Sequence, residues 1–202
     1  EAMGLYPEEA DAVARAVSKR RREFAAGRRA ARAALARLGQ RPVPILAAQS
    51  RAPLWPKGFV GSISHCEDLC LAVCARADAV LSLGVDIEAR VPLSESLREA
   101  ITTPEERDWL QQSDHVLPID VFSAKEAAFK ALYPISQKMM GFQDFCIFPE
   151  GQDQFAAELR TPAGRFSAGA RFPLLSARLK AHVLCIAVLE RATGHPISSA
   201  RD

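Results

Sequence analysis

The sequence has 202 residues, of which 49% are hydrophobic and 25% are charged, and its formal net charge is +2. This is ordinary globular composition, and the length suits one domain or two small fused units. No apolar run reaches the length of a membrane-spanning helix and no signal peptide is recognisable, so a protein without a membrane span is expected.

The N-terminal part of the chain predicts two helices, over residues 8–17 and 19–38. The first follows Pro7 and opens with two acids, which is typical of a helix start. The second ends at Gly39, with a further proline beyond it.

A strongly basic segment overlaps these helices. Residues 15–41 hold ten Lys or Arg against one acid, Glu23, while the remainder of the chain is net acidic. Such a segment predicts a polyanionic partner, which would be nucleic acid, a membrane surface or a phosphate-rich small molecule.

The middle of the chain predicts strands. A short strand is expected first, then a loop rich in Pro and Gly, then three longer strands. The ranges are 45–48 for the short strand, 53–58 for the loop, and 59–64, 69–75 and 80–87 for the longer strands. The last two are nearly all apolar, so both are expected at the centre of a sheet.

The second half predicts helices followed by strands. A first helix is expected within 89–99. A second should run from Pro104 to about Gln112, with Thr103 as its N-cap, and a third over 119–132, ended by Pro134. Strands are expected over 145–148, 154–159, 165–172 and 182–189. This order indicates an α+β fold of two similar halves, residues 1–82 and 83–192, with a disordered tail over 193–202.

Five cysteines, an odd number without a C-x-x-C pair, argue against a disulfide framework or a structural zinc site. Cys66, Cys70 and Cys74 are spaced by four, which suggests metal binding. The apolar run around them instead favours a buried strand in which cysteine acts as a small hydrophobe. A reducing cytoplasm fits this cysteine usage best.

Two pairs of charged residues carry the strongest chemical signal. Asp86 and Glu88 are two apart in an apolar run, so on a strand both carboxylates leave the same face. Glu126 and Lys130 are four apart among good helix formers and share one helix face. Together they predict a site for Mg²⁺, which prefers oxygen ligands and leaves room for substrate phosphate. In the alternative interpretation, Asp86 and Glu88 are solvated residues at a strand end, and Glu126 and Lys130 are an ordinary ion pair on a helix.

Four ordered motifs give the chain a family resemblance. They are KRRREFAAGR at 19–28, RAPLWP at 51–56 with GSISHC at 61–66, GVDIE at 84–88 and FSAKEAAFK at 122–130. Over residues 5–190 the sequence resembles the 4′-phosphopantetheinyl transferases of the Sfp/EntD type, in the branch of enterobactin synthase component D. Members of this branch normally have further residues before the point where this chain begins with Glu1, so a longer native N-terminus is expected.

The resemblance implies a fold of two pseudo-twofold-related halves and a defined reaction. The 4′-phosphopantetheine group of coenzyme A would move to a serine of an apo acyl, peptidyl or aryl carrier protein, releasing 3′,5′-ADP. Siderophore, nonribosomal peptide or polyketide carriers are the expected partners, and a monomer is expected. Nucleic acid is not an expected partner, because coenzyme A itself carries the phosphates that a basic helix attracts.

The resemblance also assigns roles to residues. Mg²⁺, with Mn²⁺ as the alternative metal, would be held by Asp86, Glu88 and Glu126. The residues expected to contact coenzyme A are Arg20, Arg28, Arg51, Ser64, His65, Lys125 and Lys130, with Arg28 on the 3′-phosphate. Glu105 would take the serine proton, with Glu126 or a metal-bound water as the alternatives. His115, His182 and His195 are expected to be packed or surface residues.

Two other functions fit parts of the pattern. A Mg²⁺-dependent nuclease would use the same acids and lysine, with the basic helix along a phosphate backbone. A non-catalytic nucleic-acid-binding module would use residues 15–41, but it would leave the acids unexplained and lacks interleaved aromatic residues.

Overall fold

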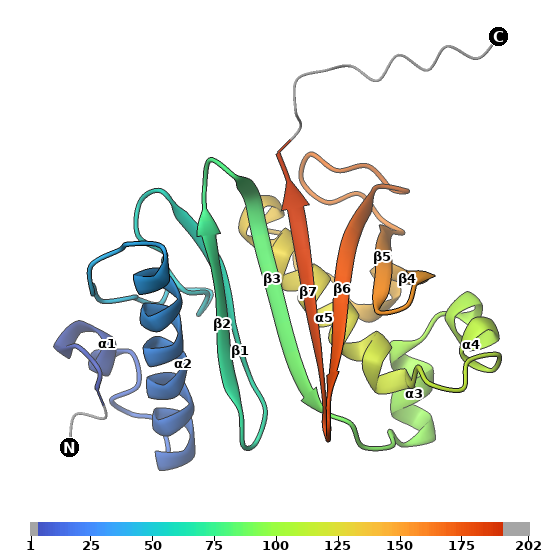
Figure 1. The fold of residues 1–202 in the computed structure, drawn as a ribbon, viewed down its shortest axis with the longest axis horizontal. Coiled ribbons are helices and arrows are strands. Elements are labelled where there is room, and N and C mark those ends of the chain that lie inside the picture. Colours follow the sequence, from blue (N-terminus) through green and yellow to red (C-terminus); the bar gives the residue numbers. More distant parts are fainter. Residues whose placement is uncertain (1–3, 192–202) are drawn as a thin grey trace, which may run out of the picture.

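The computed structural model describes residues 4–191 as a mixture of helices and antiparallel strands (Figure 1). The elements in chain order are α1 (Pro7–Asp11), α2 (Ser18–Arg37), β1 (Phe59–His65), β2 (Cys70–Arg76), β3 (Val80–Ala89), α3 (Glu95–Ile101), α4 (Pro104–Leu110), α5 (Pro118–Ser136), the 3₁₀ turn η1 (Phe142–Asp144), β4 (Phe145–Gly151), β5 (Gln154–Leu159), β6 (Arg171–Leu179) and β7 (His182–Glu190). The predicted α+β class is confirmed.

The strands form two sheets. β1 and β2 make a two-stranded antiparallel hairpin, and β3, β7, β6, β5 and β4 follow one another in a five-stranded antiparallel sheet. β3 is the edge strand of the larger sheet and lies beside the hairpin (Figure 1). The end of β1 and the end of β3 are therefore neighbours in space.

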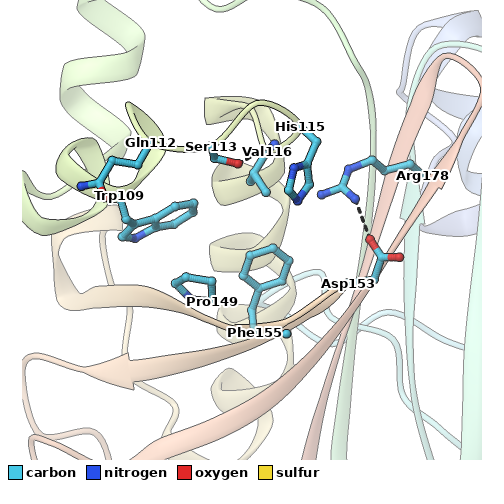
Figure 2. A pocket seen from close by; sticks show the side chains of 10 residues that line it. Trp109, Gln112, Ser113, His115, Val116, Pro149, Asp153, Phe155 and Arg178 are labelled. Carbon is cyan, nitrogen blue, oxygen red and sulfur yellow. Dashed lines mark hydrogen bonds and ion pairs between the residues drawn. The ribbon is translucent and has the colours of Figure 1, made fainter.

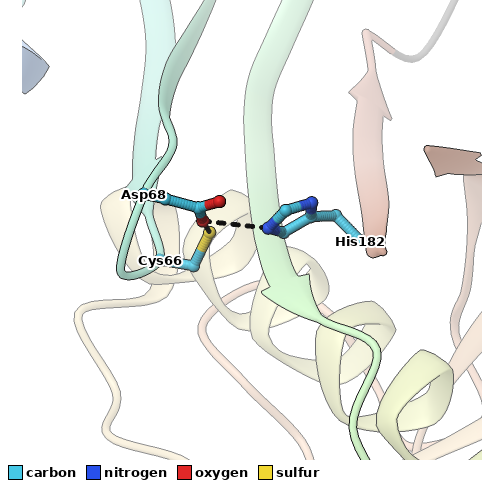
Figure 3. A group of neighbouring side chains, drawn as sticks. All are labelled: Cys66, Asp68 and His182. Atoms are coloured by element: carbon cyan, nitrogen blue, oxygen red, sulfur yellow. Dashed lines mark hydrogen bonds and ion pairs between the residues drawn. The ribbon is translucent and has the colours of Figure 1, made fainter. Parts of the chain in front are cut away.

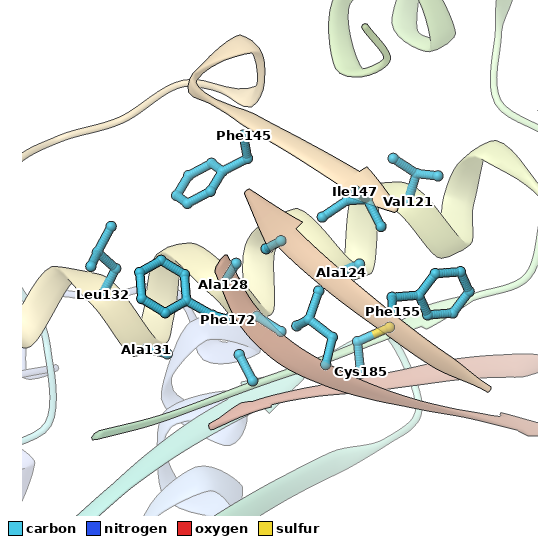
Figure 4. Close-up of a cluster of buried hydrophobic side chains, with 14 of the residues drawn as sticks. Val121, Ala124, Ala128, Ala131, Leu132, Phe145, Ile147, Phe155, Phe172 and Cys185 are labelled. Atoms are coloured by element: carbon cyan, nitrogen blue, oxygen red, sulfur yellow. The ribbon is translucent and has the colours of Figure 1, made fainter. Parts of the chain in front are cut away.

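Each sheet is covered by one long helix. α2 packs on the hairpin and buries Ala31 and Leu35, which are four apart and share a face, against Ile45. α5 packs on the five-stranded sheet and forms the main core with the strand side chains (Figure 4). Small residues line the buried face of α5, at Ala124, Ala127, Ala128 and Ala131, so its backbone lies close to the strands.

Gly84 of β3 marks the closest approach between α5 and the sheet. A Cβ added there would overlap the carbonyl oxygen of Ala127 and lie 2.5 Å from the backbone nitrogen of Ala131. Only glycine fits such a contact. Since alternate strand residues share a face, the same packing brings α5 next to Asp86.

Two helices and one short strand differ from their predicted ranges. α1 ends at Asp11 instead of residue 17, and the strand expected over 45–48 is reduced to a single bridge between Ala47 and Pro53. α5 continues past Pro134 to Ser136. A proline in the last turn removes one terminal hydrogen bond, and tertiary packing of the helix outweighs that loss.

The strand predictions also needed correction. β6 begins at Arg171, whereas strand was predicted over 165–172, because Gly169 adopts φ of +83° and interrupts the extended backbone. The strands over 69–75 and 80–87 were both predicted to be central, but β2 belongs to the two-stranded hairpin and β3 is the edge strand of the larger sheet. The predicted tail over 193–202 lies outside the described residues.

Within residues 4–191, no helix has both the length and the apolar character that crossing a membrane requires.

Candidate functional site

A groove of about 370 Å³ opens where β1, β3 and α5 meet. Each element contributes two predicted site residues: Ser64 and His65 from β1, Asp86 and Glu88 from β3, and Glu126 and Lys130 from α5. Ile63 and Phe122 add apolar surface. Six of the residues singled out in the sequence thus lie in one place, on three segments far apart in the chain.

Asp86, Ser64 and Lys130 form a compact hydrogen-bonded triangle. Asp86 Oδ1 accepts from Ser64 Oγ at 2.9 Å and from Lys130 Nζ at 2.6 Å, and Nζ also donates to Ser64 Oγ at 3.0 Å. Asp86 is only 2% exposed, and its second oxygen, Oδ2, is buried with no hydrogen-bond partner. A buried carboxylate oxygen of this kind is costly unless a cation or a donor engages it.

The neighbouring carboxyl groups of Glu88 and Glu126 have raised pKa values. Burial first, and then the charge of Asp86, raise the pKa of Glu88 to about 7 against the opposing effect of Lys130. Burial also raises the pKa of Glu126, again opposed by Lys130. Three acids therefore share one lysine, and the unbalanced negative charge favours a further cation.

The donor set fits Mg²⁺ in chemistry, since all three side chains offer carboxylate oxygens. The ligand atoms of the three acids are nevertheless not close together. Among residues 4–191, the one group of three His, Cys, Asp or Glu ligand atoms that lie within 4.8 Å of one another is at a different place in the structure. Lys130 Nζ is bound to Asp86, where a metal ion would otherwise approach.

The raised pKa of Glu88 predicts a pH-dependent stability. Its folded-state pKa of about 7 exceeds the ordinary 4.5, so the folded state holds this proton more tightly than the unfolded state. In metal-free protein, this contribution to the free energy of unfolding should be full below about pH 4.5 and lost as pH rises through about 7. Urea unfolding in a chelator, at several pH values, should show the loss in wild type and a flatter profile in Glu88→Gln. Parallel profiles for the two proteins would contradict it.

A second groove, of about 440 Å³, continues from His65 along α2. Its lining includes Lys19, Arg22 and Glu23 of the basic helix. His65 lines both grooves, and its Nε2 accepts a hydrogen bond from Arg20 Nη1 at 3.2 Å. Lys19 and Arg22 were not singled out from the sequence, although both lie in the 19–28 motif.

Arg28 and Arg51 line neither groove. Arg28 is 5% exposed, with Nε donating to the carbonyl of Ile45 at 2.7 Å and Nη2 lying 3.5 Å from the carbonyl of Leu46. Burial lowers its pKa to about 10. Arg51 is exposed on the loop before β1, at φ of +68°.

Lys125 does not reach the groove, contrary to the prediction. Its ammonium group is buried and pairs with Glu106 Oε2 at 2.7 Å, while donating to the carbonyls of Ile101 and Phe142 at 2.8 and 2.9 Å. Consecutive helix residues point about 100° apart, so a helix that turns Glu126 toward the groove turns Lys125 away from it.

Glu105 also lies outside the groove, which argues against its predicted role as the base. It is an exposed residue of the first turn of α4 and pairs with Arg160 at 3.0 Å. α4 packs beside β4, on the far side of the five-stranded sheet from the hairpin (Figure 1).

A separate cavity of about 230 Å³ lies between α4, the loop after it and β5 (Figure 2). Trp109, Pro149 and Phe155 supply its apolar wall, and Arg178 pairs there with Asp153 at 2.6 Å. None of the site residues predicted from the sequence lines it.

Comparison with known proteins places two family models on the chain. Residues 8–75 match the 4′-phosphopantetheinyl transferase N-terminal domain, and residues 82–187 match the 4′-phosphopantetheinyl transferase superfamily. The two matches together span the three elements that form the groove.

Individual relatives agree with these models. The chain is 37% identical over 186 residues to the 4′-phosphopantetheinyl transferase Npt of Nocardia iowensis, covering 87% of this chain and 83% of that protein. It is 42% identical over 165 residues to the 4′-phosphopantetheinyl transferase Svp of Streptomyces mobaraensis, covering 78% and 67%. Enterobactin synthase component D of Escherichia coli K12 is 38% identical over 141 residues, covering 67% and 65%.

Proposed function

Because the chain belongs to the 4′-phosphopantetheinyl transferase superfamily, we propose that the groove between β1, β3 and α5 is its active site. The protein is a transferase that moves the 4′-phosphopantetheine group of coenzyme A to a serine of a carrier protein. The observation that carries the assignment of the site is the meeting of six motif residues in one groove. The nuclease and nucleic-acid-binding alternatives have no support among the matches.

The reaction forms a bond between the serine Oγ and the β-phosphorus of coenzyme A and breaks the bond to the leaving 3′,5′-ADP. Such a transfer depends on charge neutralisation and on aligning the two oxygens. Lys130 and His65 face the groove and would contact the pyrophosphate, while Ser64 holds Lys130 in position. Arg20 would add a further positive charge through its contact with His65.

We assign the metal site to Asp86, Glu88 and Glu126, with Mg²⁺ as the ion and Mn²⁺ as the alternative. When bound, the ion would neutralise pyrophosphate charge. The unpartnered Oδ2 of Asp86 and the crowded acids around Lys130 support this assignment. For the serine proton, Glu126 is the better candidate than Glu105, since only Glu126 lines the groove.

Arg28 remains our candidate for the 3′-phosphate. Its Nε donates to the carbonyl of Ile45. Its Nη2 makes only a long contact of 3.5 Å with the carbonyl of Leu46, so this edge of the guanidinium can bind a phosphate. Calorimetry should show Arg28→Ala weakening coenzyme A at least about 10-fold more than 3′-dephospho-coenzyme A, because only the former has that phosphate. Arg37→Ala, at the far end of α2, is the control. An equal loss of affinity for both ligands would mean that Arg28 only holds the 45–46 segment in place and does not contact the 3′-phosphate.

The carrier protein is proposed to dock on an apolar surface next to the acids. A groove of about 220 Å³ is lined by Phe129, Met139, Met140, Phe142 and other residues, and it shares Glu126 with the proposed active site. Methionine suits a surface that accepts several partners, which fits siderophore, nonribosomal peptide and polyketide carriers.

Met139 offers a test of this docking surface, because 73% of it is exposed. Met139→Glu should lower kcat/KM for the carrier about 10-fold, since the glutamate removes an apolar contact and repels an acidic carrier surface. The KM for coenzyme A should not change. Met139→Leu keeps the apolar contact and should behave like wild type. A carrier kcat/KM unaffected by Met139→Glu would move the docking surface elsewhere.

The two family matches support a division into halves over residues 1–82 and 83–192. A pseudo-twofold relation between the halves stays a prediction: each half packs one long helix on a sheet, but one sheet has two strands and the other five. We further propose that the protein is a monomer and that it works in a reducing cytoplasm; the five free cysteines support the second of these proposals.

The activity is tested by incubating the chain with coenzyme A, Mg²⁺ and a panel of apo carrier proteins. Mass spectrometry should find one phosphopantetheine group on the carriers served, and none on carriers whose acceptor serine is replaced by alanine. Cleavage of plasmid DNA by the chain and Mg²⁺, with no adduct on any carrier, would favour the nuclease.

A further inference from the structure

Three metal-ligating side chains converge at a second place, outside the acid groove (Figure 3). Cys66 and Asp68 lie in the turn between β1 and β2, and His182 is the first residue of β7. His182 Nε2 donates to Asp68 Oδ1 at 3.0 Å, and Cys66 Sγ lies 3.6 Å from the same oxygen. All three ligand atoms lie within 4.8 Å of one another.

These separations match the edges of a tetrahedral zinc site. With Zn–N and Zn–O bonds of about 2.0–2.1 Å and a Zn–S bond of about 2.3 Å, tetrahedral angles give edges of about 3.3 Å for N···O and about 3.5 Å for S···O. The observed 3.0 and 3.6 Å are close to both. Two of the three edges therefore fit one shared ion, and the third, between Cys66 Sγ and His182 Nε2, is within 4.8 Å.

We propose that Cys66, Asp68 and His182 bind a borderline-soft transition metal ion of the Zn²⁺ class, with a fourth coordination position left open. Sulfur and imidazole nitrogen favour such an ion over Mg²⁺, which prefers oxygen alone. Binding forms a metal–sulfur and a metal–nitrogen bond. The thiol proton of Cys66 is released to solvent, and the imidazole proton of His182 leaves Nε2, where it now bonds Asp68, so that the ring binds the ion as the tautomer protonated at Nδ1.

The surroundings leave this site accessible and electrostatically balanced. The side chain of Asp68 is 66% exposed and that of His182 is 13% exposed, so an ion can enter from solvent. The adjoining groove contains Lys19 and Arg22 but also Glu23 and Glu67. A thiolate and a carboxylate together add two negative charges for the ion.

The site joins the two halves of the chain. Its ligands are separated by 114 residues between Asp68 and His182, and Cys66 directly follows His65 of the proposed active site. An ion held here would fix the β1–β2 turn against β7 and with it one wall of the coenzyme A groove. The predicted consequences are a higher Tm and a slower exchange of coenzyme A when the metal is bound.

The test titrates the full chain with Co²⁺, a spectroscopic substitute for Zn²⁺, in excess Mg²⁺. One equivalent should produce a thiolate-to-cobalt absorption band, and Zn²⁺ should abolish it. Cys66→Ser should lose the band, whereas Cys70→Ser, which alters a half-buried thiol of the same hairpin, should keep it. Asp68→Asn and His182→Asn should weaken Co²⁺ at least about 10-fold.

Three outcomes would overturn the proposal. No band in the wild-type chain, or one that persists in Cys66→Ser, means that the thiol does not bind the ion. Asp86→Asn separates this site from the acid groove: the band should remain in that variant, and its loss would show that the ion bound by the thiol also depends on Asp86. Circular dichroism checks that each variant is folded, and His182→Asn keeps the test decisive if Cys66→Ser is not.

Discussion

Replacing Asp86 with alanine should reduce the rate of phosphopantetheine transfer about 100-fold or more while the chain stays folded. Asp86 Oδ1 is the acceptor that holds both Ser64 and Lys130, and Oδ2 is the orphaned oxygen we assign to the metal. The substitution removes both functions together. A factor of 100 corresponds to about 3 kcal/mol of lost transition-state stabilisation, which is a modest value for the loss of a metal ligand.

The measurement is single-turnover transfer to an apo carrier at a fixed Mg²⁺ concentration. Asp86→Asn serves beside Asp86→Ala because it keeps the shape of the side chain and removes its charge. Asp114→Ala alters an exposed acid in the loop before α5 and should leave the rate unchanged. Near-normal transfer by Asp86→Ala at ordinary Mg²⁺ would refute the assigned metal site.

Gly84→Ala should lower the free energy of unfolding by about 3 kcal/mol, at the upper end of what overpacking of a core costs. The added Cβ meets the backbone of α5 at Ala127 and Ala131, and a helix backbone cannot move aside as a flexible side chain can. The helix would have to shift as a unit. Any such shift carries Glu126 and Lys130 away from Asp86, so transfer should fall even in the folded fraction.

Urea unfolding followed by circular dichroism measures this effect. Gly151→Ala in β4 is the matched control, because the nearest atom to its added Cβ is 3.7 Å away and its backbone angle is ordinary. Unchanged stability of Gly84→Ala would mean that α5 does not pack on β3 as closely as described.

The part of the site that the sequence predicts rests on local spacing. The two-residue period of a strand fixes the common face of Asp86 and Glu88, and the four-residue period of a helix does the same for Glu126 and Lys130. Ser64 and His65 are found through their motif. The family resemblance implied that the residues of these motifs meet, and the structure shows six of them in one groove.

The sequence could not show the surroundings of a side chain where they come from distant segments. Lys125 is beside Glu126 in the motif, but only the placement of α3, α4 and η1 around α5 shows that its ammonium group is buried. Arg28 is covered by the segment at 45–46, and Cys66 meets a histidine from the opposite end of the chain. No periodicity within one element contains this information.

The ion pair between Lys130 and Asp86 means that folding does not require a bound metal ion to balance the Asp86 charge. Asp86 is buried, and a charged group without compensation there would oppose folding. Lys130 Nζ, on a side chain that is 28% exposed, already supplies a positive charge at 2.6 Å. The chain can thus fold with an internal counter-ion in place. If Asp86 holds the metal ion as we propose, the ion would replace one cation by another there, and Lys130 would be free to contact the phosphate.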